Sequence, residues 1–231
     1  MYSNDRLVIL DADGTTVDAF SAIDRTFALN GMEIGSFIRF QRRRHVFKYL
    51  GGAKEFPRNL RKQIGRQKRS RLIATLTEIY REEGRLFDGA AELMDRLAGR
   101  PGLWVGIVTR NITLNPVETL ETLFRREGFD PARLDFLVHV PLTQEKLDAF
   151  RQVRARFEVN PALAYACGDE AKDYLAALGA GMHPFIVSYG FEDFERLTGR
   201  HGIPEEVISH SPTELAARLF HTLHMQSGPW G

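Results

Sequence analysis

Two acidic residues, Asp11 and Asp13, stand two positions apart in the short segment DADGT near the start of the sequence. They follow the apolar residues 7–10, which predict a strand buried on both faces of a sheet. Two carboxylates this close raise the cost of ionising each other unless they share a cation. The pair therefore outlines a site for a hard divalent ion such as Mg²⁺ together with a phosphate group. The alternative is an ordinary Asx-rich turn after a strand.

A second group of acids, Asp169, Glu170 and Asp173, follows the apolar run 162–167. Two acids four positions apart at a strand end can place one carboxylate on a metal and the other behind it, where it supports the ligands. The alternative is a helix N-terminus, which requires only Asp169 as a capping acid. Ligands of open α/β sheets bind at the carboxyl ends of strands, so both acidic groups are suitably placed for a binding site.

Strands that alternate with helices must position these acids. Continuous apolar runs predict strands and the amphipathic segments between them predict helices, a pattern typical of an α/β fold with a doubly wound, Rossmann-like parallel sheet and right-handed crossovers. The expected strands are residues 7–10, 103–108, 136–140, 162–167 and 185–188, with a possible short one at 207–208, and helices are expected at 116–127, at 144–157 and from Pro212 onward.

The segment between the first two strands shows no strand pattern. Its apolar residues keep helical spacing near residues 20–27 and 72–80, which predicts a helical insert in the sheet domain. Residues 189–191, after the fifth strand, are expected to line the floor of the cleft or to contact this insert. The predicted division is a core domain of residues 1–17 and 86–231 and an insert of residues 18–85.

The bulk composition is that of a globular protein: 231 residues, 43% hydrophobic and 26% charged. The longest purely apolar run, 162–167, is far short of the roughly 20 residues that a membrane helix needs, and no secretory signal is visible. We therefore expect a cytoplasmic protein that does not span a membrane. The single cysteine, Cys167, excludes an intrachain disulfide framework and is expected to be a buried core thiol.

Positive charge is concentrated in one part of the insert. Residues 39–71 contain thirteen Lys and Arg and one acid, a net charge of +12, whereas the whole chain carries +1. The remainder of the chain therefore carries −11. A basic segment of this kind could meet an anionic ligand, although a solvated basic face is the more common alternative.

The segment DADGT, with Val17-Asp18 behind it, resembles the first motif of the haloacid dehalogenase (HAD) superfamily, most of whose members are phosphohydrolases. The usual motif has a large apolar residue in place of Ala12 and Leu in place of Thr16, departures that concern the subfamily because neither position supplies chemistry. Three further motifs follow in the same order as in the superfamily: Thr109 at the end of the second strand, Lys146 before the fourth, and Gly168-Asp169-x-x-x-Asp173 after it.

The resemblance implies a Mg²⁺-dependent phosphatase that hydrolyses a small phosphorylated metabolite. Asp11 would attack phosphorus and form an aspartyl phosphate, while Asp13 would act first as general acid and then as general base. Mg²⁺ would be held by Asp11, the main-chain carbonyl of Asp13, and Asp169, with Glu170 or Asp173 behind them. The phosphoryl oxygens would be bound by Gly14, Thr15, Thr109, Arg110 and Lys146.

Two of these assignments have simple alternatives. Thr109 ends a strand, where β propensity alone favours threonine. Lys146 lacks the proline that often follows the lysine of the third motif, and a solvated surface lysine is common.

The insert lies where the phosphoglycolate phosphatase and β-phosphoglucomutase relatives in this superfamily have a helical cap that closes over the core and selects the substrate. We hypothesise that some of its arginines bind a second anionic group of the substrate, such as another phosphate or a carboxylate. A solvated basic face is the better interpretation for most of the thirteen basic residues. The candidates are Arg39, Arg42, Arg43, Arg44, Arg58 and Arg61.

Two other functions are compatible with the sequence. A phosphosugar mutase would use the same acids, and a protein of a different class would bind nucleic acid or another polyanion through the basic insert. The intact set of acids disfavours a purely binding role, and Asp13 and Asp169 disfavour dehalogenation, which needs neither a metal nor an acid at the second position. The expected partner is a small phosphorylated substrate, and the sequence does not predict the oligomeric state.

Overall fold

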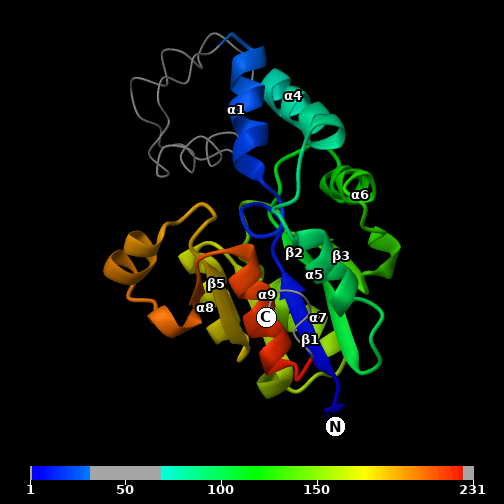
Figure 1. The fold of residues 1–231 in the computed structure, drawn as a ribbon, viewed down its shortest axis with the longest axis vertical. Coiled ribbons are helices and arrows are strands. Elements are labelled where there is room, and N and C mark those ends of the chain that lie inside the picture. The colour runs from blue at the N-terminus through cyan, green and yellow to red at the C-terminus, as the bar shows by residue number, and fades with distance from the viewer. Residues whose placement is uncertain (1, 32–68, 226–231) are drawn as a thin grey trace.

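The computed structural model describes residues 2–31 and 69–225. These residues form a six-stranded sheet with helices on both faces, and the helices α1 and α4 lie beyond the carboxyl ends of the strands (Figure 1). The strand order is β3-β2-β1-β4-β5-β6, and every neighbouring pair is parallel. The predicted doubly wound parallel sheet is therefore confirmed. The strands are β1 Arg6–Leu10, β2 Leu103–Thr109, β3 Phe136–His139, β4 Ala164–Gly168, β5 His183–Val187 and β6 Ile208–Ser209.

Helices connect the strands as the apolar pattern predicts. The fourth strand begins two residues later than expected, because residues 161–163 form a 3-10 turn that starts at a proline and the strand pairs with β1 only from Ala164. No helix in the described part of the chain has the length and apolar character needed to cross a membrane. The helices are α1 Ala19–Leu29, α4 Arg69–Glu82, α5 Ala90–Leu97, α6 Pro116–Arg126, α7 Lys146–Arg156, α8 Ala171–Gly179 and α9 Pro212–Thr222.

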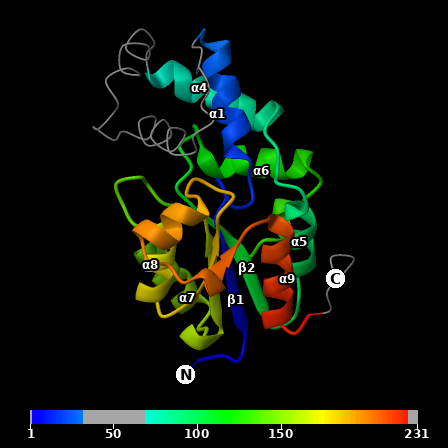
Figure 2. The ribbon, with the colours of Figure 1, turned by 60° about the vertical axis from the view of Figure 1, so that its left-hand side comes forward.

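Both faces of the sheet are covered, which explains why β1 is apolar throughout instead of alternating. Leu7 and Ile9 pack into a cluster with α7 and α8, whereas Val8 and Leu10 pack into the cluster that includes α5 and α9. Figure 2 shows these two helix pairs on opposite sides of the sheet. Cys167 in β4 is buried, as expected, and burial raises the pKa of its thiol.

The strand order creates a reversal point beside β1. From β1 the chain proceeds outward through β2 to β3 and then returns to β4, on the other side of β1. In sheets with this order, ligands bind in the crevice at the carboxyl ends of the two strands that flank the reversal. The residues that follow β1 and β4 include both acidic groups of the sequence.

Two helices of the insert, α1 and α4, lie side by side beyond the carboxyl edge of the sheet (Figure 1). The chain leaves and re-enters the core through two paired segments: the Asp18 amide donates to the Arg85 carbonyl and the Phe87 amide to the Thr16 carbonyl, both at 2.9 Å. These crossings coincide with the predicted limits of the insert, and the division into two domains stays a prediction.

The candidate substrate-binding arginines of the insert lie outside the described residues. They are Arg39, Arg42, Arg43, Arg44, Arg58 and Arg61.

Close packing of β2 against β3 gives a stability prediction. A Cβ at buried Gly106 would overlap the main-chain oxygen and the ring of Phe136. We expect Gly106→Ala to lower the free energy of unfolding by about 1–3 kcal/mol, the range for overpacking, as measured by urea denaturation. Gly199→Ala is the control, because a Cβ there meets nothing within 4 Å. An equal effect of the two substitutions would contradict this account.

Candidate active site

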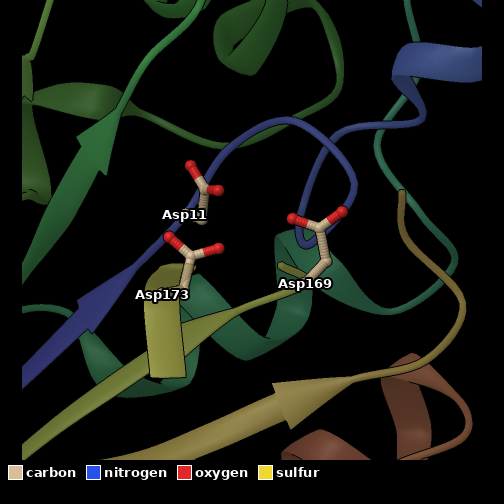
Figure 3. A group of neighbouring side chains, drawn as sticks. All are labelled: Asp11, Asp169 and Asp173. Atoms are coloured by element: carbon tan, nitrogen blue, oxygen red, sulfur yellow. The ribbon is translucent and has the colours of Figure 1, made fainter. Parts of the chain in front are cut away.

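Three carboxylates meet at the carboxyl edge of the sheet. Asp11 follows β1, Asp169 follows β4, and Asp173 lies in the first turn of α8. One oxygen of each lies within 4.8 Å of the others, and all three side chains are buried. Figure 3 shows their carboxyl groups facing one another. The reversal point of the sheet thus brings together acids that lie more than 150 positions apart in the sequence.

Lys146 is the cation of this cluster. It is the first residue of α7 and is 4% exposed, and its Nζ lies 2.6 Å from Asp11 Oδ2 and 2.8 Å from Asp173 Oδ1. Burial favours the neutral amine, but the two carboxylates outweigh it and hold the pKa of Lys146 well above its ordinary value. Lys146 is therefore a buried, charged partner of Asp11 and not the solvated surface lysine that was its alternative.

Asp169 has an oxygen that protein groups leave unsatisfied. Its Oδ2 accepts from the Phe191 amide, whereas its buried Oδ1 has no hydrogen-bond partner among the residues that the structure describes. Burial, followed by the charges of Asp11 and Asp173, raises the pKa of Asp169 well above its ordinary value. A buried acceptor without a partner is costly unless another group meets it.

A divalent cation fits this arrangement. Asp11, Asp169 and Asp173 provide three negative charges in one buried cluster, and Lys146 provides one positive charge. The donors that converge are carboxylate oxygens, the ligands preferred by hard ions such as Mg²⁺. Asp173 already uses Oδ2 to accept from the Glu170 amide and Oδ1 to pair with Lys146, which suits it to support the ligands.

Asp11 is tied to its surroundings through both oxygens. Oδ1 accepts from the Ala12 amide at 2.8 Å and Oδ2 pairs with Lys146. Burial raises the pKa of Asp11 to about 7, and Lys146 acts in the opposite direction. Positive charge beside Asp11 thus favours the ionised form that a nucleophile requires.

Asp13 has different partners from the other acids. Its Oδ1 accepts from the Tyr80 hydroxyl at 2.7 Å, and the Asn111 amide nitrogen lies 3.1 Å from Oδ1 and 3.0 Å from Oδ2. Burial raises the pKa of Asp13 to about 6, while Tyr80 and Asn111 act to lower it. The carboxylate of Asp13 is not part of the three-acid cluster. The role expected for the main-chain carbonyl of Asp13 as a metal ligand stays a prediction.

Sequence reasoning missed Tyr80 and Asn111. Tyr80 ends the amphipathic stripe of α4, so helical spacing predicts a place on the apolar face, and its ring does lie in the core. Asn111 follows Thr109 by two positions, and a polar amide just beyond a strand end was the available signal. Neither pattern indicates contact with Asp13, because that contact depends on how α4 and the loop after β2 are placed.

The turn after β1 is stabilised by its own amides. The Gly14 amide donates to the Val17 carbonyl at 3.0 Å and the Thr15 amide to the Ala12 carbonyl at 3.2 Å. The phosphate-binding role expected for these two residues stays a prediction. Gly14 is required because its φ is +84° and a Cβ would overlap Asp169. The buried Thr15 hydroxyl has no hydrogen-bond partner among the described residues, so it keeps the capacity to donate.

The side chains of Arg110 and Glu170 pair with each other at 3.0 Å. The roles expected for Arg110 in phosphate binding and for Glu170 behind the metal ligands stay predictions. Arg110 follows β2 and Glu170 follows β4, so the pair connects the loops on either side of β1. Both side chains are 13% exposed, which shelters the interaction from solvent. Thr109 is fully buried, and its hydroxyl accepts from the Asn111 amide at 3.2 Å.

The loop after β5 contacts the turn after β1 and the insert, which is one of the two positions expected for residues 189–191. The Tyr189 hydroxyl donates to the Thr15 carbonyl at 3.0 Å, and the Phe191 ring meets the Phe20 ring of α1 with centroids 4.9 Å apart. Buried Glu192, which the sequence analysis missed, accepts from the Ala171 amide at 2.6 Å and so caps α8. This contact fixes the helix that carries Asp173.

Comparison with known proteins identifies the family. The model of the haloacid dehalogenase-like hydrolase family matches residues 6–181. The chain belongs to this family. A phosphoglycolate phosphatase of Synechococcus elongatus is 30% identical over 112 residues, which make up 48% of this chain and 50% of that protein. This HAD-family chain therefore spans, in that match, about half the length of its curated relative.

Solved structures of other proteins share the fold. A haloacid dehalogenase-like family protein from Streptococcus pneumoniae superposes with a TM-score of 0.64 at 20% identity, covering 94% of this chain and 99% of that one. CbbY from Rhodobacter sphaeroides, solved in complex with phosphate, has a TM-score of 0.59 at 23% identity and covers 91% and 96% of the two chains. At these identities the comparison shows the fold alone.

The raised pKa values give a prediction about metal and pH. The pKa of Asp11 rises from 3.8 to about 7 and that of Asp13 from 3.8 to about 6. Between these pH values the metal-free folded protein therefore holds protons that the unfolded chain has released. Its free energy of unfolding should therefore fall as the pH rises from about 4 to about 7. We expect Mg²⁺ to raise the thermal midpoint at pH 8, where Asp11 and Asp13 are mostly ionised, and much less at pH 5.

Two variants test this prediction: Asp169→Asn changes the acidic cluster, and Asp148→Asn is the control. Asp169→Asn should abolish most of the Mg²⁺ effect, whereas Asp148, whose side chain is 82% exposed, should be neutral. Equal Mg²⁺ effects at the two pH values would argue against binding by the buried acids.

Proposed function

We propose that this protein is a Mg²⁺-dependent phosphatase that hydrolyses a small phosphomonoester through an aspartyl-phosphate intermediate. The observation that carries the proposal is the position of Asp11, which lies beside two further buried carboxylates and 2.6 Å from Lys146. A bound Mg²⁺ would supply positive charge that orients the phosphoryl group and offsets its negative charge. The remaining chemistry belongs to residues of the chain.

Asp11 is the nucleophile. Its carboxylate forms a bond to phosphorus as the bond between phosphorus and the ester oxygen breaks, which leaves an aspartyl phosphate and an alcohol. Water then attacks the phosphorus of this intermediate, releases inorganic phosphate and restores the carboxylate. Lys146 offsets the charge that gathers on the phosphoryl oxygens and on Asp11 in both steps.

Asp13 is the general acid and general base. It protonates the departing ester oxygen in the first step and takes a proton from the attacking water in the second. A pKa of about 6 allows both forms near neutral pH, and burial is the main cause of this value. The donors for phosphoryl oxygens are Lys146 and, by its buried and unpartnered hydroxyl, Thr15.

A substrate with a second anionic group is the best-supported class. The relative from Synechococcus elongatus is named for phosphoglycolate, which carries a carboxylate as well as a phosphate. The net charge of +12 in residues 39–71 suits such a ligand if part of this segment faces the site. Screening mono- and bisphosphates and phosphorylated carboxylic acids tests the preference for a second anionic group. Equal rates on singly and doubly anionic compounds would contradict this preference.

The test of the reaction class is Asp11→Asn in a Mg²⁺-containing screen of phosphorylated metabolites that measures released phosphate. We expect the variant to lose at least about 10³-fold in kcat, because it lacks the nucleophile. Asp148→Asn serves as the matched control, since this exposed acid on α7 lies outside the site. Full activity of Asp11→Asn would refute the proposed nucleophile.

Product analysis separates the hydrolase from the mutase. Free phosphate from a sugar phosphate supports hydrolysis, whereas an isomeric sugar phosphate without phosphate release supports the mutase. Loss of binding to nucleic acid or polyphosphate with rising salt, in a protein without turnover, would favour the polyanion-binding alternative.

A further inference from the structure

A tyrosine from the insert reaches the proposed general acid. Tyr80 lies in the last turns of α4, is fully buried, and donates its hydroxyl hydrogen to Asp13 Oδ1 at 2.7 Å. Asp13 belongs to the core, 67 positions earlier in the sequence. This contact crosses the boundary between the predicted insert and the core, and no motif used above assigns it a role.

Asn111 holds the same carboxyl group from the core side. Its Oδ1 accepts from the Thr113 amide at 2.8 Å and from the Thr113 hydroxyl, which fixes the orientation of the side-chain amide. The Asn111 Nδ2 therefore faces Asp13, at 3.1 Å from Oδ1 and 3.0 Å from Oδ2. Asp13 Oδ1 has two donors and Asp13 Oδ2 has one.

We propose that Tyr80 is a positioning residue that fixes Asp13 with Oδ1 as a permanent acceptor, so that Oδ2 carries the proton delivered to the leaving group. A carboxyl oxygen accepts about two hydrogen bonds, and Tyr80 and Asn111 fill this capacity at Oδ1. A proton on Oδ1 would displace one of these donors. The inference rests on the proposed function, in which Asp13 protonates the ester oxygen.

The packing of α4 determines where the Tyr80 hydroxyl lies. The Tyr80 ring belongs to an apolar cluster that joins α1, α4 and α6. One turn earlier, the Thr77 hydroxyl accepts from the Leu114 amide at 2.8 Å, and Arg126 of α6 donates to the carbonyls of Tyr80 and Arg81. The insert therefore contributes a group that orients the acid, in addition to any part it has in selecting substrate.

Tyr80→Phe tests the inference because it removes the hydroxyl and keeps the ring. The measurement is kcat/KM with Mg²⁺ across a series of aryl phosphates, from p-nitrophenyl phosphate to phenyl phosphate. Phenolate is the poorer leaving group and depends more on protonation, so we expect about a tenfold or greater loss for phenyl phosphate and a much smaller loss for p-nitrophenyl phosphate. The plot of log(kcat/KM) against leaving-group pKa should become steeper.

Two further variants separate positioning from loosened packing. Thr75→Val removes a hydroxyl of the same helix that donates to the Arg71 carbonyl at 3.0 Å, within α4, so it should lower all rates by the same factor or leave them unchanged. Asn111→Leu removes the other donor to Oδ1 and should steepen the plot as Tyr80→Phe does, which keeps the test valid if one variant folds poorly by circular dichroism.

The outcomes distinguish this inference from the proposed function. A wild-type protein that hydrolyses none of the aryl phosphates or screened metabolites would overturn the proposed phosphatase and the role of Tyr80 with it. An active wild type whose Tyr80→Phe variant gives an unchanged slope would overturn only the positioning role. The same steepening with Thr75→Val would also overturn it, because a general disturbance of α4 would then explain the effect.

Discussion

The candidate active site depends on a buried cluster of side chains in which acidic groups outnumber basic ones. Asp11, Asp169 and Asp173 meet at one point, and Lys146 neutralises only part of their charge. Ions removed from water are costly unless opposite charge accompanies them, so this edge of the sheet favours either bound protons or a bound cation. The second case supplies the charge that a phosphoryl group needs, and the same feature thus links stability to the proposed chemistry.

Strand order produces this convergence. The acids come from loops after β1 and β4, which become neighbours because the chain reverses its direction of winding after β3. Short contacts then fix the loops: a Cβ at Gly14 would overlap Asp169, and the Phe191 amide binds the same carboxylate. Rigid strands, close loop packing and the two ion pairs of Lys146 hold the acids in place.

The insert takes part in this site through α1 and α4. Phe20 packs on Phe191, while Tyr80 binds Asp13. In such an arrangement, a change in the position of α4 alters the surroundings of Asp13. The packing of this one helix therefore links the insert to the acids that follow β1.

Local patterns in the amino-acid sequence are enough to predict the strands, the helices and the residue types at their ends. Local apolar periodicity fixes strands and helices, and acids that follow buried strands indicate a cation site. Which of these groups meet depends on the fold: Tyr80 and Asn111 bind Asp13, Arg110 pairs with Glu170, and the Gly14 amide donates within its own turn. Some of these contacts join segments far apart in the chain, and others depend on which nearby carbonyl an amide binds. The periodicity of apolar residues contains no information about either kind of contact.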